Sequence, residues 1–287
     1  DTGDDDTGDD DTGDDDTGDD DTGDDDTGDD DDSGDDDDDD DDTVAVPCDA
    51  ARTWLTGDLV VSTANDLTNF CAFYDAVDGD LLLQNNSSVL TLVSLSCLCE
   101  VTGDLKIENA SSLGELSGLN SLQAVGGELK LKALGAAVAL PAFTSLTSVG
   151  ALKIEENPLL VSLGVGFPAL TTVAGELKIK QSGVLTAVGG FPLLQSVGGH
   201  LKFEENPVLV TIDGFPLLGP VGDELKVSNN SVLITMNGLF NVTSVGGHFK
   251  IQDNPILSTS WQAEALRDAI GVANIGGNVI IGGNGLP

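Results

Sequence analysis

A short alternation of apolar and polar residues recurs along most of the chain. In most copies two apolar residues flank one polar residue, as in Leu201-Lys202-Phe203, and charged residues lie just outside them. Period-two alternation is typical of a β-strand with one buried and one solvent-facing side. Turn residues follow each copy, such as Asn206-Pro207 and then Gly214-Phe215-Pro216. Apolar residues between these turns, including Leu209, are expected to return to the interior.

The alternation repeats at a nearly constant interval. Successive strands begin 22 to 30 residues apart, and most intervals are 24 residues. A period of this length predicts a solenoid, in which each turn buries its apolar side only by stacking on its neighbours. We therefore expect a mainly β, right-handed parallel β-solenoid of about ten turns. The first apolar positions of its strands are Leu59, Leu81, Leu105, Leu129, Leu152, Leu177, Leu201, Leu225, Phe249 and Val279.

Other positions of the repeat predict columns inside the solenoid. One column has an aromatic ring or a leucine on successive turns, and a second has valine. Asparagine occupies one corner and is expected to bond the backbone of adjacent turns as a ladder, interrupted at Leu134 and Ser182. The three columns are Leu119, Phe143, Phe167, Phe191, Phe215 and Leu239; Val125, Val149, Val173, Val197, Val221 and Val245; and Asn157, Asn206, Asn230 and Asn254.

The ends of the chain depart from the repeat. We divide it into an Asp-rich low-complexity tail (1–42), a Cys-containing cap with the first turn (43–78), the solenoid repeats (79–257), and a capping helix with a final strand (258–287). The helix is expected from Ser258 to Gly271, with Ser260 as N-cap and Gly271 as C-terminal stop. Trp261, Ala265 and Ile270 are expected to cover the last turn. The final strand is expected over 278–281.

The repeat resembles a known family. Gly-Asp-Leu-Lys-Ile-Glu-Asn (103–109), followed by Leu113, Leu116, Gly118-Leu119, Leu122 and Val125-Gly126-Gly127, is similar to the receptor L domain, a leucine-rich-repeat-like solenoid of receptor ectodomains and cell-surface proteins. The resemblance covers residues 57–257. It implies the solenoid fold and a binding role with no general catalytic activity, and it transfers no ligand-contacting residue to this chain.

The N-terminal tail carries most of the charge. Of the formal net charge of −39, 28 negative charges are aspartates of residues 1–42, which leaves −11 for residues 43–287. A segment without apolar residues is expected to be a disordered, extended spacer. Two alternatives remain open, namely weak Ca²⁺ binding within Asp1–Asp42 and O-glycosylation at the threonines of the five-residue repeat. Those threonines are Thr2, Thr7, Thr12, Thr17, Thr22 and Thr27.

The four cysteines lie in the first turns. Cys48, Cys71, Cys97 and Cys99 are an even number at an end with no preceding turn to cover it, which favours a disulfide-stapled cap and an oxidising compartment. Because a Cys97–Cys99 bridge would be strained, we expect both to pair with Cys48 and Cys71, in either order. A zinc site is the alternative, weakened by the absence of paired CxxC spacing.

Lysines occupy one outward position of the repeat, and we call them the lysine column. Lys132 and Lys180 lie two residues further along the same face, and acidic residues flank the column on both sides. One interpretation is a solvated face with ion pairs worth at most about 1 kcal/mol each. The other is a flat binding strip for a regularly spaced polyanion, such as an acidic glycan or the tail of another copy. The column comprises Lys106, Lys130, Lys153, Lys178, Lys202, Lys226 and Lys250.

Catalytic and cofactor motifs are weak in this sequence. His200 and His248 are two turns apart, or roughly 10 Å, which favours two surface histidines over a shared metal site. We find no nucleophile elbow, HExxH or phosphate-binding glycine loop. N-glycosylation sequons begin at Asn85, Asn86, Asn109, Asn229 and Asn241.

These observations favour a non-enzymatic, extracellular binding or adhesion protein of a bacterial cell surface. Its ligand would be a protein or an anionic glycan, and nucleic acid is disfavoured by the net charge. No apolar run is long enough for a membrane span, and the start at Asp1 without Met or signal peptide favours a mature or trimmed product. The alternative is a self-assembling structural subunit, a filament or matrix component whose tail takes part in assembly.

Overall fold

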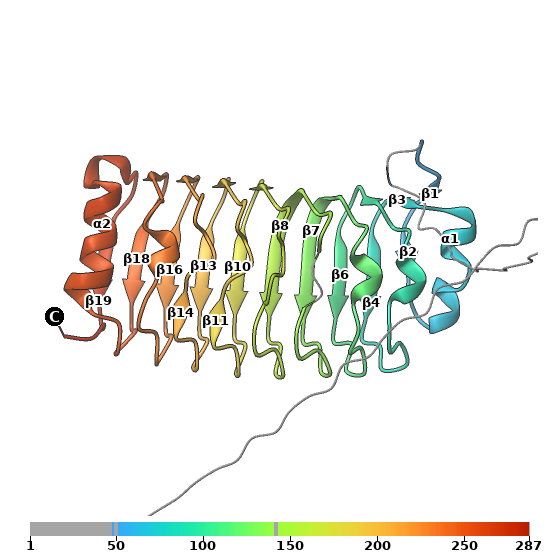
Figure 1. The fold of residues 1–287 in the computed structure, drawn as a ribbon, viewed down its shortest axis with the longest axis horizontal. Helices are drawn as coiled ribbons and strands as arrows, with labels where there is room; N and C mark the ends of the chain where they lie inside the picture. The colour runs from blue at the N-terminus through green and yellow to red at the C-terminus, as the bar shows by residue number, and fades with distance from the viewer. Residues whose placement is uncertain (1–47, 49–50, 141–142, 287) are drawn as a thin grey trace, which may run out of the picture. The chain divides into compact units, whose positions relative to one another are not determined.

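The computed structural model describes residues 48, 51–140 and 143–286. These residues form a parallel β-solenoid whose coils stack side by side (Figure 1), as the repeat predicts. The Asp-rich tail 1–42 lies outside the described residues, together with its candidate calcium and O-glycosylation sites.

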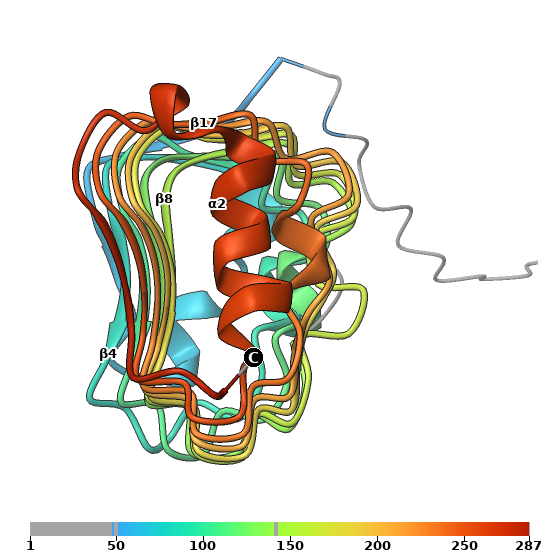
Figure 2. The same ribbon diagram turned by 90° about the vertical axis from the view of Figure 1, so that its left-hand side faces the viewer.

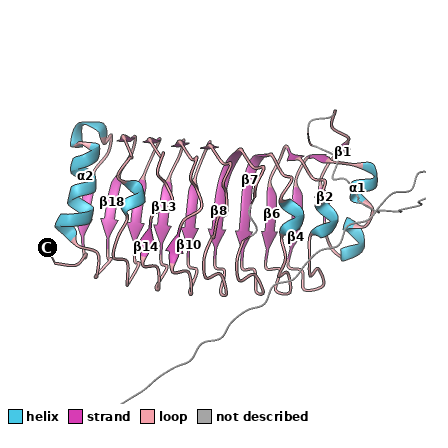
Figure 3. Cartoon of the chain, in the orientation of Figure 1, coloured by secondary structure: helices cyan, strands magenta, loops and turns pink. Residues whose placement is uncertain are grey.

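The longer strands of successive coils pair in parallel as the main ladder (Figure 3). Each strand pairs with the corresponding strand of the next coil, so Leu177 lies beside Leu152 on one side and Leu201 on the other. The ladder consists of β2 (Leu59–Val60), β4 (Leu81–Gln84), β6 (Leu105–Glu108), the second half of β7 (Ala124–Lys132), the second half of β8 (Ser148–Glu155), β10 (Leu177–Lys180), β13 (Leu201–Glu204), β16 (Leu225–Ser228), β18 (Phe249–Gln252) and β19 (Val279–Gly282). Because the first and last coils are irregular, the ten strands correspond to about eight solenoid turns, fewer than the ten turns expected.

Shorter strands precede the main-ladder strand on every coil except the last, and those from the fourth coil onward carry the valine column. This second ladder contains β1 (Trp54–Thr56), β3 (Ala76–Asp78), β5 (Glu100–Val101), the first residues of β7 and β8, β9 (Thr172–Val173), β12 (Ser196–Val197), β15 (Pro220–Val221) and β17 (Ser244–Val245). On another side of the coil, β11 (Ala187–Val188) pairs with β14 (Thr211–Ile212). Short 3₁₀ turns replace strands elsewhere: η2 (Val93–Leu95), η3 (Ser117–Leu119) and η4 (Asn237–Leu239).

The expected interior columns are present. The rings of Phe143, Phe167, Phe191 and Phe215 are fully buried and stack nearly parallel, with 4.9–5.1 Å between successive centroids. That spacing matches the distance between paired strands, so stacking the coils also stacks the rings. The burial of each ring thus depends on the coil above and the coil below it.

The asparagine ladder is also confirmed, with its interruptions. The Asn206 side chain accepts the backbone N–H of Ser182 at 3.0 Å and donates to the Ile179 carbonyl at 3.1 Å. Asn230 and Asn254 make the same bonds one and two coils later, and Asn284 extends the ladder. These amides satisfy the buried backbone groups of the corner. At the interruption, the buried Ser182 hydroxyl has no hydrogen-bond partner.

The same corner imposes an uncommon backbone conformation. The residue that follows the main strand has a positive φ of 51–58° on eight coils, where Asn, Asp, Glu, Gln or Ala occupies the position, and Gly283 after β19 has a φ of 67°. Left-handed φ is costly for a residue with a side chain. The position is therefore determined by stacking rather than by local preference. Those residues are Asn85, Asn109, Ala133, Glu156, Gln181, Glu205, Asn229 and Asp253.

Helical segments cover the C-terminal end of the stack, as expected, but with a different arrangement. A π-helical segment, η5 (Thr259–Glu264), continues into α2 (Ala265–Ile270), which lies across the end of the coils (Figure 2). The predicted N-cap was wrong, because the Ser258 hydroxyl, not Ser260, accepts the Trp261 backbone N–H. Trp261 was also wrongly predicted to cover the core, since it is 77% exposed. Ala263, Leu266 and Ile270 are the buried residues.

Further short helices lie at both ends and were not predicted. They are η1 (Ala64–Leu67) and α1 (Phe70–Phe73) in the first coil, and η6 (Val272–Asn274) after α2. Leu67 and Phe70 are buried against the first strands. The first coil therefore closes its apolar end with helical turns as well as with disulfides.

Candidate functional site: the lysine column

The register of the main ladder places the lysine column in a single row. Lys106 pairs in register with Lys130, Lys153 with Lys178, and Lys202 with Lys226, and the intervening pairs and Lys250 continue the series. Lys132 and Lys180 lie on the same face, as expected. Identical charges on directly opposed positions are unfavourable, so this row requires compensating charges.

Acidic side chains compensate the row in an alternating pattern. Lys153 bonds Glu128 at 2.6 Å and lies 3.6 Å from Glu176, and these two acids immediately precede the first main-ladder leucines of their coils, Leu129 and Leu177. The next lysine, Lys178, bonds Glu155 at 3.0 Å, on the opposite side of the row. The same alternation covers all seven positions. Lys106, Lys153, Lys202 and Lys250 pair with Asp104, Glu128, Glu176 and Glu224; Lys130, Lys178 and Lys226 pair with Glu108, Glu155 and Glu204.

This alternation keeps neighbouring ammonium groups apart. A lysine whose partner precedes the strand is followed on the next coil by a lysine whose partner lies near the end of the strand. Neighbouring lysines therefore bond carboxylates on opposite sides of the row. The two outer lysines, Lys132 and Lys180, pair with Glu156 and Glu205 at the left-handed corner, at 3.0 and 3.1 Å. Every lysine of the face is therefore ion-paired, and the surface presents alternating charges rather than a bare cationic strip.

The face is less solvated than the sequence suggests. The side chains of the lysine column are only 18–30% exposed, and Glu155, Glu204 and Glu224 are buried. Breaking a pair around a buried carboxylate costs more than breaking a surface pair, because the remaining charge loses both its solvation and its partner. The limit of about 1 kcal/mol for exposed pairs therefore applies to the outer pairs only.

Hydrogen bonds and lysine neighbours lower the pKa values of Asp104, Glu108 and Glu224. A hydrogen bond from the Glu128 backbone N–H, and then one from Lys106, lower the pKa of Asp104. Burial alone would raise the pKa of Glu224, but Lys250 and Lys202 outweigh burial, so the pKa lies below its ordinary value. The pKa of Glu108 is lowered in the same way, against burial, chiefly by Lys130. A general acid needs a raised pKa, so these carboxylates suit charge pairing and not proton donation.

The two histidines take part in the same face as hydrogen-bond acceptors. Nδ1 of His248 accepts the Asn278 backbone N–H at 2.9 Å, and Nδ1 of His200 lies 3.4 Å from the Glu224 backbone N–H. Asp58 and Asp80 accept the equivalent N–H groups of the first coils. The histidines thus substitute for aspartate in a structural role, two coils apart as expected.

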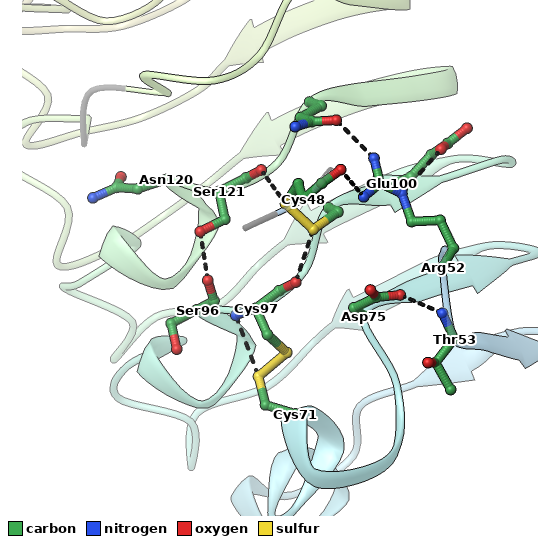
Figure 4. The surroundings of a disulfide bond; sticks show 12 residues. Cys48, Arg52, Thr53, Cys71, Asp75, Ser96, Cys97, Glu100, Asn120 and Ser121 are labelled. Carbon is green, nitrogen blue, oxygen red and sulfur yellow. Dashed lines mark hydrogen bonds and ion pairs between the residues drawn. A yellow bond between two sulfur atoms is a disulfide. The ribbon is translucent and has the colours of Figure 1, made fainter. Parts of the chain in front are cut away.

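A disulfide cap stabilises the N-terminal coils (Figure 4). Cys48 pairs with Cys99, and Cys71 pairs with Cys97, which confirms the expected exclusion of a Cys97–Cys99 bridge and selects one of the two open orders. The zinc alternative is wrong, because the four cysteines form two disulfides and leave no free thiol to bind a metal. Arg52 joins the cap by donating to the Cys48 carbonyl and, at 2.6 Å, to Gln123.

The sequons differ in their accessibility. Asn85, Asn109, Asn229 and Asn241 are exposed, whereas Asn86 is buried and its amide donates to the Ser62 carbonyl at 2.7 Å. Asn86 is therefore excluded as a glycan acceptor in the folded chain. Asn85 and Asn109 lie on adjacent coils and are hydrogen-bonded to each other at 2.9 Å.

Two further properties concern only the part of the chain that the structure describes. Within residues 48, 51–140 and 143–286, no three His, Cys, Asp or Glu side chains are grouped so as to hold a metal ion. In the same residues, no helix has the length and apolar character needed to cross a bilayer.

Comparison with models of protein families, with curated proteins and with solved structures found no match. The two disulfides are consistent with an oxidising, extracellular environment.

Proposed function

We propose that the chain is a non-enzymatic binding or adhesion module of a bacterial cell surface, built on a solenoid of the receptor L domain type. The observation that carries the proposal is the lysine column itself. It presents charged groups at a constant interval on seven paired strands, and an extended partner with repeating charges would match that interval.

The expected partner is an extended polyanion, such as an acidic glycan or an acidic protein segment. Because each lysine is paired with a carboxylate of its own chain, the polyanion must replace these partners. Binding is therefore expected to be of modest affinity and to weaken steeply with salt, since both the ligand and the face are screened. Regular spacing would add the contributions of neighbouring lysines along one ligand chain.

Retention on immobilised alginate, an acidic polysaccharide, tests this proposal. The test variant replaces Lys153, Lys178 and Lys202 with Gln. The matched control replaces the exposed serines Ser87, Ser111 and Ser231 with Asp, which changes the net charge by the same −3 but leaves the column intact.

We expect the wild type and the serine control to be retained at low salt and the lysine variant to pass through. Circular dichroism must show that the lysine variant is folded. A second variant, with Lys132 and Lys180 replaced by Gln, removes only pairs to exposed carboxylates and should also weaken retention. Equal retention of all four proteins, or no retention of the wild type, would contradict the proposal.

The alternative function, a self-assembling structural subunit, is supported by a different observation. The terminal strand β19 carries Ile280 at the position of the lysine column, and its pairing partner on the inner side is Lys250. An uncharged edge strand is prone to pair with another chain. Electron microscopy with calcium and with chelator distinguishes the two functions, because filaments would favour assembly and separate particles under both conditions would oppose it.

A further inference from the structure

An exposed aliphatic surface lies away from the lysine column. Leu159, Val184, Val208, Val232 and Ile256 occur on five successive coils, two residues after the asparagine-ladder position, and are 37–57% exposed. We call these five residues the aliphatic ridge. On the three preceding coils the same position holds Ser88, Ser112 and Ala136. The repeat therefore does not require a large apolar side chain there, and its presence on these five coils needs another cause.

Backbone hydrogen bonds hold this surface in register. The N–H of Thr186 donates to the Val161 carbonyl at 3.0 Å, that of Val210 to Thr186 at 2.8 Å, and that of Ile234 to Val210 at 2.9 Å. These residues lie two positions beyond the ridge on each coil. Val161 and Ile234 are themselves 44% and 51% exposed, so they widen the apolar surface beside the ridge.

Two features of the ridge indicate what covers it. Neither the ridge nor the row beside it (Val161, Thr186, Val210 and Ile234) carries a charged residue. Residues 43–287 as a whole have a net charge of −11. Two copies can therefore meet at these two rows without placing like charges in direct contact, and the nearest acids along the chain, Glu156, Glu205 and Asp253, lie three residues before the ridge positions. In addition, the ridge side chains repeat at the spacing between stacked strands, and they interdigitate best with side chains that repeat at the same spacing. The ridge of a second copy has that spacing.

The exposed area also fits an interface between two copies. From the exposed fractions, the ridge with Val161 and Ile234 offers roughly 500 Å² of apolar surface per copy, near the upper end for the largest patch of a monomer. Two copies would bury about 1,000 Å² in total, which is the lower limit for a specific interface. The interface would join identical surfaces through a two-fold axis, the commonest arrangement of homodimers.

We propose that the aliphatic ridge is a homodimer interface, in which two copies pack face to face near Val208. This proposal does not depend on the binding function of the lysine column, because the ridge and the column use different residues. The occupant is a second copy of this chain rather than a membrane or an unrelated protein, for the reasons of interval, charge and area given above.

Sedimentation velocity of the full-length chain over a range of concentrations tests the proposal. The test variant replaces Val184, Val208 and Val232 with Thr, a residue that the neighbouring row already accommodates at Thr186. The control replaces Leu90, Leu193 and Leu217 with Thr; these leucines are 45–63% exposed, more than the three valines, and lie outside the ridge. We expect the wild type and the control to dimerise and the ridge variant to dissociate with a Kd at least tenfold higher.

A second measurement locates the contact. In a dimer centred near Val208, the V208C variant should form an intermolecular disulfide on mild oxidation, whereas L90C should not. A wild type that stays monomeric at every concentration and salt level would overturn the proposal. Equal dimerisation of the ridge variant and the control would also overturn it, as would equal cross-linking of the two cysteine variants.

Discussion

Lys153 and Lys178 lie directly opposite each other on adjacent parallel strands, yet their ammonium groups bond carboxylates on opposite sides of the row, Glu128 at 2.6 Å and Glu155 at 3.0 Å. This relationship explains how seven lysines can stack in register. The strand spacing would bring like charges together, and the alternating acids separate them and neutralise them in pairs.

Removing one lysine should cost more stability when its carboxylate partner is buried than when that partner is exposed. Lys178→Met leaves the buried Glu155 without the lysine that it bonds, so we expect unfolding free energy to fall by about 1–3 kcal/mol. Lys132→Met is the control, because its partner Glu156 is well exposed, and it should cost about 0.5 kcal/mol or less. Urea denaturation measures both, and equal losses would show that the column is an ordinary solvated face.

The cost of Lys250→Met should depend on pH. The pKa of Glu224 is lowered in the fold below its ordinary value of 4.5, partly by Lys250. The ion pair therefore contributes stability above about pH 4.5, and that contribution is lost as the pH falls and Glu224 takes up a proton. The stability difference between wild type and variant should be largest near pH 7 and shrink below pH 4.5. A difference that is constant from pH 7 to pH 3 would contradict the assigned pairing.

Completing the asparagine ladder should stabilise the fold. Ser182→Asn places an amide where the present hydroxyl is buried without a partner, and the neighbouring coils show that an amide there bonds the backbone. We expect a gain of about 1 kcal/mol. In the reverse direction, Asn206→Ser should cost about 1–3 kcal/mol, because it leaves the Ser182 N–H unpaired. Thermal unfolding followed by circular dichroism checks both, and a destabilising Ser182→Asn would argue against the ladder.

The left-handed corner predicts that glycine is favourable at one alanine. Ala133 has φ of 51°, which glycine adopts without steric cost, so Ala133→Gly should leave stability unchanged or raise it by up to about 1 kcal/mol. Ala151 lies in β8 and has no positive φ, so Ala151→Gly should cost about 0.5–1 kcal/mol. If both variants lose stability equally in denaturant titrations, the corner conformation is not as described.

The period alone predicted most of the architecture, because stacking converts a fixed sequence interval into a fixed spatial position. The phenylalanine, valine and asparagine columns and the row of lysines all follow from the interval and from strand alternation. The position of Asn86 was less predictable. Its sequon is a local motif, whereas its burial depends on the backbone of the preceding coil, where its amide bonds Ser62.

The sequence alone could not predict which of several similar partners a side chain would contact. The sequence showed acids on both sides of the lysine column but not which acid each lysine selects, since Lys178 has candidates on three strands. The order of the disulfides was open because Cys97 and Cys99 lie close together in the chain, and only the fold places Cys97 beside Cys71. Trp261 was expected to cover the last turn, yet it lies in the π-helical segment η5 and is 77% exposed, while Ala263 of the same segment is buried.

The spacing of the lysine column is the claim on which the binding proposal depends, and double electron–electron resonance measures it directly. Spin labels at Lys106→Cys and Lys202→Cys span four strand intervals, and labels at Lys106→Cys and Lys250→Cys span six. The backbone separations should be about 19 Å and about 29 Å. Label distances that do not lengthen by about one strand spacing per coil, or a broad distribution for both pairs, would contradict a single row of lysines.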